Sequence, residues 1–112
     1  MQYALLIYTH PGNQDAERPM DSAIAAVLAK PNVTGWARLH AEESATTVRH
    51  GAIEAVLSDG PFIETKEYLA GLVMVEAGNL DEALVVAQEL HETMTAGAIE
   101  VRPVREARFH GA

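Results

Sequence analysis

Two uncharged apolar stretches constrain the fold of this chain more than any other feature of its sequence. Tyr3–Tyr8 forms the first stretch, and Leu69–Val75 forms the second. Neither approaches the roughly 20 residues that a membrane-spanning helix requires. A short, continuous apolar run bounded by turn-forming residues is typical of a strand that is buried on both faces. The sequence therefore predicts two central strands.

A short helix is expected to follow the first strand. It should lie between Ser22 and Lys30, with Asp21 or Ser22 as its cap, and Pro31 should end it. Its apolar face is formed by Ile24, Val27 and Leu28. The spacing of these residues indicates a helix that packs one face on a sheet.

A second helix and a last strand are predicted in the C-terminal part of the chain. Asn79 is the expected N-cap, and Glu82 three residues later resembles a capping box. Apolar residues recur at helical spacing at Leu80, Ala83, Leu84, Ala87, Leu90 and Met94. Gly97 should end the helix, and Ile99–Arg102 alternates as a strand does. Pro103 indicates that this strand ends there or lies at an edge of the sheet.

The middle of the chain is expected to contribute further strands. Gly35–His40 is a candidate second strand, and Thr46–Arg49 can pair with Ile53–Leu57 as a hairpin around His50-Gly51. Ser58–Pro61 should then break the strand pattern. Trp36 lies in the candidate second strand, where it could serve either the core or a pocket.

This order of elements predicts an α+β, ferredoxin-like fold, in which an antiparallel sheet has its helices on one face. The other face of the sheet would stay apolar and uncovered. A two-fold partner is the simplest cover, so a homodimer is expected. Residues 1–106 should form one domain, and 107–112 should form a loose C-terminal tail.

Composition excludes several classes of function. The 112 residues include no cysteine, which removes disulfides, thiolate zinc sites and a cysteine nucleophile. The net charge of −8 disfavours nucleic acid and anionic membranes as partners. The absence of a signal-peptide pattern and of a membrane span predicts a cytoplasmic protein. No cofactor-binding fingerprint is present, so no cofactor is expected.

The segment Ser58–Glu67 begins with Ser-Asp-Gly-Pro-Phe and resembles the DGPF branch of the YCII-related family. The other segments that carry this resemblance are Tyr3–Tyr8, Ala45–Arg49, Leu69–Gly71, Asn79–Ala83 and Ile99–Val104. The resemblance implies a ferredoxin-like dimer of the α/β-barrel type, with a pocket between the sheet and the surrounding loops. It also implies relatives that act on small aromatic or chlorinated compounds, and genes that are associated with extracytoplasmic-function sigma factors.

One feature of the wider family is missing from this chain. Some YCII-like proteins carry a proposed His-Asp pair, but the predicted first helix, Ser22–Lys30, contains no histidine. The pair is therefore not transferred. The segment between the first two strands is also shorter than is usual in the DGPF branch.

The segment around Asp59 can be interpreted in two ways. Asp59-Gly60-Pro61 has the residues of an ordinary turn. Beside it, Glu64, Lys66 and Glu67 form either a solvated, ion-paired loop or a site for proton transfer. In the catalytic interpretation Asp59 moves a proton and Lys66 stabilises developing negative charge.

Other candidate residues lie near the ends of predicted strands. His10 and His40 are acid/base candidates, because histidine titrates near neutral pH. Tyr8, Phe62, Glu64 and Glu67 are the candidate substrate-binding residues. The five histidines include no close pair with metal-ligand spacing, so no metal site is expected.

Two classes of function follow from these residues. One is a cofactor-independent enzyme that acts on a small molecule, such as a lyase, an isomerase or a dehydrochlorinase. The other is a non-catalytic module that binds a ligand or a protein in a sigma-factor pathway. An enclosed pocket with converging polar groups would favour the first, and a shallow surface beside the Asp59 motif would favour the second.

Overall fold

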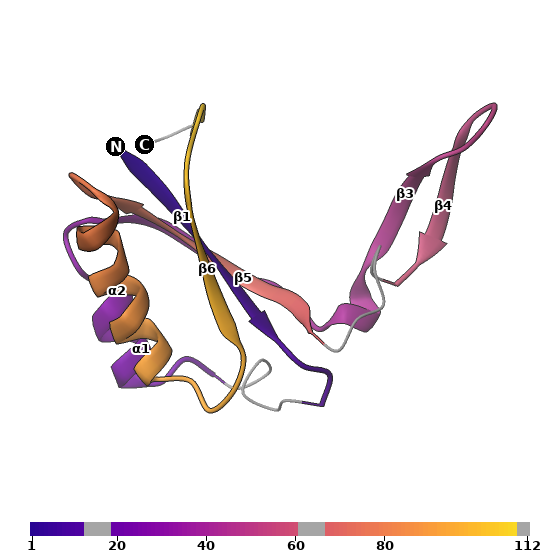
Figure 1. Cartoon of the computed structure of the whole chain (residues 1–112). Helices are drawn as coiled ribbons and strands as arrows, with labels where there is room; N and C mark the ends of the chain where they lie inside the picture. Colours follow the sequence, from indigo (N-terminus) through magenta and orange to yellow (C-terminus); the bar gives the residue numbers. More distant parts are fainter. Residues whose placement is uncertain (13–18, 61–66, 110–112) are drawn as a thin grey trace.

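A four-stranded antiparallel sheet with two helices on one face forms the body of the protein (Figure 1). The computed structural model describes residues 1–12, 19–60 and 67–109. The strands of the sheet are β1 (Gln2–Thr9), β2 (Val33–Arg38), β5 (Tyr68–Glu76) and β6 (Ala98–Pro103). The helices are α1 (Ser22–Leu28) and α2 (Leu80–Glu92).

The spatial order of the strands is β2-β5-β1-β6. Each neighbouring pair is antiparallel, and the two strands that were predicted from the apolar runs, β1 and β5, occupy the centre. Each helix connects a central strand to an edge strand, which is the ferredoxin-like arrangement. The predicted α+β fold class is confirmed, and β6 lies at an edge, as Pro103 indicated.

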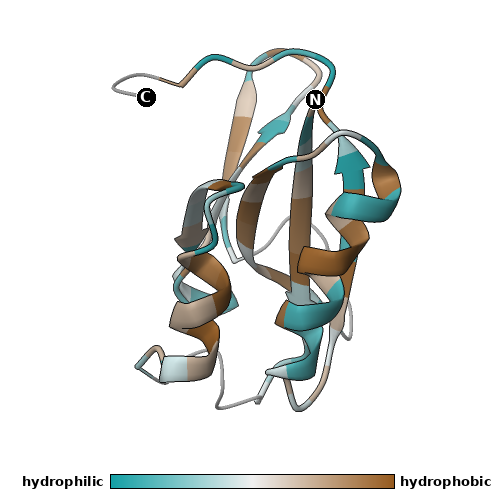
Figure 2. Ribbon diagram, turned by 90° about the vertical axis from the view of Figure 1, so that its left-hand side faces the viewer, coloured by the Kyte–Doolittle hydropathy of each residue, from teal (hydrophilic) through white to brown (hydrophobic). Residues whose placement is uncertain are grey.

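The core lies between the sheet and the helices. Alternate residues of the central strands point toward it, including Tyr3 and Leu5 of β1 and Val73 and Val75 of β5. From α1 and α2 the buried residues are Val27, Ala83, Val86, Ala87 and Leu90. Figure 2 shows the two helices side by side in front of the apolar central strands. The burial of this face holds α1, only seven residues long, in place.

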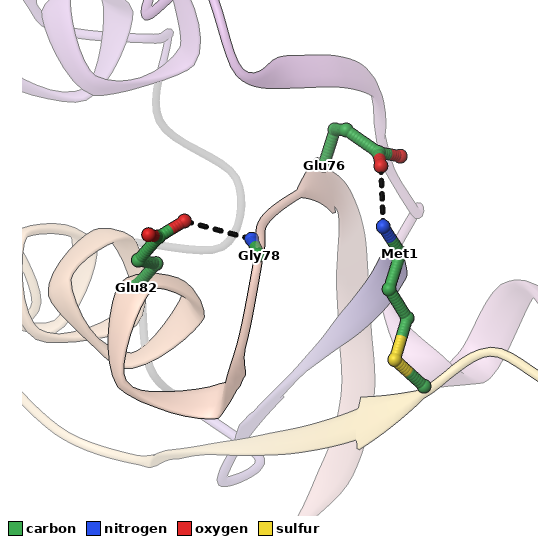
Figure 3. Close-up of polar contacts among 4 residues, drawn as sticks. All are labelled: Met1, Glu76, Gly78 and Glu82. Atoms are coloured by element: carbon green, nitrogen blue, oxygen red, sulfur yellow. Dashed lines mark hydrogen bonds and ion pairs between the residues drawn. The ribbon is translucent and has the colours of Figure 1, made fainter.

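The start of α2 differs slightly from the predicted capping box. The side chain of Asn79 accepts a hydrogen bond from the backbone N–H of Glu82 at 3.0 Å, as an N-cap does. The carboxylate of Glu82 accepts one from the N–H of Gly78 at 2.7 Å, not from Asn79 (Figure 3). Figure 3 also shows the N-terminal amine of Met1 paired with Glu76, the last residue of β5.

The predicted bounds of β2, the predicted apolar face of α2 and the predicted burial of β1 need correction. β2 begins at Val33 and ends at Arg38, so His40 lies beyond the strand. Within α2, Leu80 is half exposed at the first turn, whereas Val86, absent from the predicted apolar face, is buried. β1 is not buried on both faces within one chain, because its residues that point away from the helices are only partly buried.

The predicted hairpin forms a separate two-stranded sheet. Its strands are β3 (Thr46–His50) and β4 (Ala55–Asp59), preceded by the 3-10 turn η2 (Glu42–Ser44). The turn is wider than expected, and Ile53 lies in it rather than in β4. Ser58 and Asp59 do not break the strand pattern, because they pair with Thr47 and Thr46. We call residues 46–59 the arm.

The arm extends away from the body on the side opposite the helices (Figure 1). No helix of the described residues covers that side of the sheet, and we call it the open face. Its β1 residues are Ala4, Leu6 and Tyr8, which alternate with the core residues Tyr3 and Leu5. The predicted uncovered sheet face is therefore present, while the homodimer stays a prediction.

No helix in residues 1–12, 19–60 and 67–109 is long and apolar enough to cross a membrane. The longest helix among these described residues, α2, has 13 residues.

Candidate functional site

A cavity of about 250 Å³ lies between the sheet and the two helices. Its lining comes from β1, β2 and β5, from α1, and from the end of α2 with the residues after it. The apolar side chains that line it are Ile7, Ile24, Leu28, Trp36, Leu90 and Met94. The cavity therefore continues the hydrophobic core toward the β2 edge of the sheet.

Strand β2 brings Trp36 and Arg38 to this cavity because residues two apart point to the same face. Trp36 pairs with the core residue Val73 of β5, and Arg38 pairs with Gly71. Both side chains therefore lie on the helix side of the sheet. The fractional exposure of Trp36 is 48%, which shows that the cavity is open at this edge.

The cavity also contains polar groups. Asp21 lines it, although its carboxylate already accepts a hydrogen bond from the N–H of Ile24 at 2.9 Å as the cap of α1. Thr93 lines it near the end of α2, where its hydroxyl donates to the carbonyl of Leu90 at 2.6 Å. Thr9 is buried, and Arg38 provides a cation. A mainly apolar cavity with a few polar groups is the usual form of a small-molecule site.

The described residues that were predicted as the site lie outside this cavity. Of the candidates that the structure describes, none lines this cavity. These described candidates are Tyr8, His10, His40, Asp59 and Glu67. Phe62, Glu64 and Lys66 lie outside the described residues. The catalytic and substrate-binding roles of all eight residues stay predictions.

The described candidates occupy different parts of the molecule. Tyr8 is half-buried on the open face, next to Leu69 of β5. His10 is exposed after β1, and its Nδ1 lies 3.0 Å from the carbonyl oxygen of Pro11. Asp59 is exposed as the last residue of β4, and Glu67 is exposed just before β5.

His40 lines a second hollow, which lies at the base of the arm. The residues around it are Leu39, His40, Ala41, Glu42, Ser44, Ala45, Tyr68 and Leu69. The start of the Asp59 motif is tied to this region, because the N–H of Gly60 donates to the carbonyl of Ala45 at 2.6 Å. The hydroxyl of Thr47 donates to the carbonyl of Gly60 at 2.6 Å. The hollow is more open than the cavity under the helices.

Arg38 is the cavity residue that the sequence interpretation missed, and Trp36 is the one that it left ambiguous. The alternation of Trp36 and Arg38 in a predicted strand was the available signal, since it places both on one face. The sequence did not indicate on which face of the sheet the side chains of Trp36 and Arg38 lie. That depends on the pairing of β2 with β5.

Among the described residues, no group of three or more histidine, aspartate or glutamate side chains lies close enough together to hold a metal ion. The chain has no cysteine that could contribute to such a group.

The sheet, the helices and the cavity between them define a ferredoxin-like α+β protein with an internal pocket. Comparison with known families finds that residues 1–108 match the YCII-related domain. An uncharacterized protein of Rhizobium meliloti (strain 1021) is 36% identical over 114 residues, which cover 93% of this chain and 92% of the relative. The chain belongs to the YCII-related family, as its motifs indicated. Its place in the DGPF branch of that family stays a prediction.

Proposed function

We propose that this protein binds a small, mainly apolar molecule with one anionic group in the cavity between its sheet and its two helices. The observation that carries this proposal is the placement of Arg38 in the lining of an otherwise largely apolar cavity. An apolar cavity of about 150 Å³ can hold benzene. The volume of about 250 Å³ suits one substituted ring or a molecule of similar size.

The described lining of the cavity carries one charge of each sign, the Asp21 carboxylate and the Arg38 guanidinium, and we propose that Arg38 is the one that meets the ligand. The Asp21 carboxylate is engaged by the backbone of α1. A guanidinium pairs with a carboxylate through two parallel hydrogen bonds, and such charge-assisted bonds are stronger than neutral ones. Arg38 would therefore orient the acid group, while Trp36, Ile24 and Leu28 contact the apolar part.

Trp36 makes this proposal directly testable, because it is the only tryptophan in the chain. Its fluorescence should change when the cavity fills. We expect benzoate to bind more tightly than benzyl alcohol or benzylamine, which carry the same ring with zero or positive charge. Arg38→Ala should weaken benzoate binding at least tenfold, since a hydrogen bond to a charged group contributes about 1.5–3 kcal/mol.

The matched control is Arg102→Ala, which removes an exposed arginine from β6 that does not line the cavity. It should leave benzoate binding unchanged. Equal affinities for the three compounds, or equal losses in the two variants, would contradict the anionic ligand. Thermal unfolding of each variant checks that the fold is intact.

A further proposal, beyond binding, is acid/base catalysis. The proton would be moved by Asp59, His10 or His40, and Lys66 would stabilise the developing negative charge. Asp59→Asn keeps the shape of the side chain and removes its charge. Because Asp59 is exposed and lies outside the cavity lining, we propose that this variant still binds benzoate.

A second candidate function is a module for protein interaction. The observation that favours it is the open hollow at the base of the arm, beside the Asp59 motif. An open surface of this kind suits a protein partner better than an enclosed site does. A partner in a sigma-factor pathway remains one proposal for this surface.

A further inference from the structure

The polar groups Arg38, Thr9 and Thr93 lie on two sides of the cavity. Arg38 belongs to β2, at one edge of the sheet, whereas Thr9 ends the central strand β1. Strand β5 lies between β2 and β1, so their backbones are about 9.5 Å apart, which is two strand spacings. Thr93 ends α2, and that helix packs over β6, on the far side of β1 from β2. Arg38 and the two threonines therefore lie on opposite sides of the cavity.

The floor between these two sides includes a position without a side chain. Arg38 of β2 pairs with Gly71 of β5, and Gly71 pairs with Ile7 of β1. All three residues line the cavity. Glycine has no Cβ, so only backbone is present between the side chains of Arg38 and Ile7. The apolar body of a ligand can therefore lie over Gly71, with one end at Arg38 and the other toward the threonines.

The hydroxyl of Thr93 determines what kind of group it can meet in a ligand. It donates its proton to the carbonyl of Leu90 at 2.6 Å. A threonine hydroxyl has one proton and two lone pairs, so Oγ1 of Thr93 can still accept a hydrogen bond but has no second proton to donate. A ligand group that meets this oxygen must therefore be a hydrogen-bond donor.

We propose that the ligand of this cavity is a hydroxy acid, with its acid group at Arg38 and a hydroxyl at its opposite end that donates to Oγ1 of Thr93. This inference rests on the proposed function, because it places a second group on the same ligand. A hydroxyl suits Thr93 better than an ammonium does. The threonine oxygen is a neutral acceptor, and burying a charge against it costs more than burying a hydroxyl.

Isothermal titration calorimetry of the full chain with substituted benzoates tests the position of the hydroxyl. para-Hydroxybenzoate carries its hydroxyl opposite the acid group, and ortho-hydroxybenzoate carries it beside the acid group. We expect the para isomer to bind about three- to tenfold more tightly than benzoate, which is the gain from one neutral hydrogen bond. The ortho isomer, and para-fluorobenzoate, which has no donor, should show no such gain. An equal gain for either of them would contradict a donor at the far end.

Thr93→Val removes the hydroxyl and keeps the shape of the side chain. In this variant para-hydroxybenzoate should bind no more tightly than benzoate, because its hydroxyl loses water and finds no acceptor. Thr93→Ser keeps a hydroxyl and should retain the gain. The matched control is Thr34→Val, which removes a hydroxyl that donates to the carbonyl of Met74 outside the cavity lining. It should also retain the gain, and thermal unfolding checks the fold of each variant.

The hydroxy acid and the proposed function fail in different ways. Benzoate binding that depends on Arg38, without a gain from the para hydroxyl, would overturn the hydroxy acid alone. So would a gain that survives in Thr93→Val, or one that is lost equally in Thr34→Val. If neither benzoate nor para-hydroxybenzoate binds, or if their binding does not depend on Arg38, both proposals are wrong.

Discussion

Replacing Leu5 with alanine is expected to lower the free energy of unfolding by about 3 kcal/mol. Leu5 is 0% exposed in β1, where it pairs with Val73 on one side and Val101 on the other. Alanine there loses the buried methyl groups and leaves a cavity that its strand neighbours cannot fill. A loss of this size lowers the Tm by roughly 10–15 °C for a domain of this length.

Urea unfolding of wild type and variant measures this change, with both proteins at one concentration because self-association would add to stability. Val85→Ala provides the comparison, since Val85 is 49% exposed on α2 and alanine favours the helix. The free energy of unfolding of Val85→Ala should differ from that of the wild type by less than about 0.5 kcal/mol. A Leu5→Ala loss below about 1 kcal/mol would contradict the placement of β1 at the centre of the core.

Gly97→Ala is expected to destabilise the protein by more than about 3 kcal/mol, from two causes that add. Gly97 has φ +97°, which costs a residue with a Cβ about 1–2 kcal/mol. A Cβ at this position would also overlap the backbone carbonyl oxygen of Tyr8. That oxygen belongs to the central strand β1 and cannot move without disturbing the pairing of β1 with β6.

Gly12→Ala separates the two causes. Gly12 has a similar φ of +84°, but a Cβ there would meet no atom within 4 Å. It should therefore cost only the conformational part, about 1–2 kcal/mol. Thermal unfolding of Gly97→Ala and Gly12→Ala measures the difference between their losses of stability. Equal losses would mean that the approach of Gly97 to β1 is unimportant.

The central part of the fold could be predicted because its elements carry strong local signals. The uncharged runs of β1 and β5 and the periodicity of α2 each favour one structure over the alternatives. Asn79 caps α2 as its position indicated, and Asp21, one of the two candidate caps, is the one that caps α1. Pro103 lies in an edge strand, where its missing N–H is tolerated.

The arm was predicted less well because it lacks a buried face. Alternation marks a strand only where one side is covered, and every residue of β4 is exposed in this chain. The boundaries of β4 were therefore shifted toward Ile53, its most apolar neighbour. Ser58 and Asp59 were assigned to a turn by residue type, although the ladder with Thr46 and Thr47 includes them.

The candidate site shows a second kind of feature that could not be predicted from the sequence. The sequence drew attention to Asp59 because of its motif, whereas the cavity lies under the helices and involves Arg38 and Trp36. Local spacing shows that these two residues share a face. Only the register of β2 on β5 shows that this face points toward α1 and α2. Long-range pairing of this kind is not encoded in a short motif.

The most direct test of ligand binding in the cavity is a titration of ¹⁵N-labelled protein with benzoate, followed by heteronuclear NMR. Binding in the cavity predicts shifts at the indole N–H of Trp36 and at the amides of Ile24 and Thr93, with the arm residues Val48 and Leu57 unchanged. Shifts confined to the arm and the hollow at its base, or no shifts up to millimolar benzoate, would contradict a ligand site between the sheet and the helices.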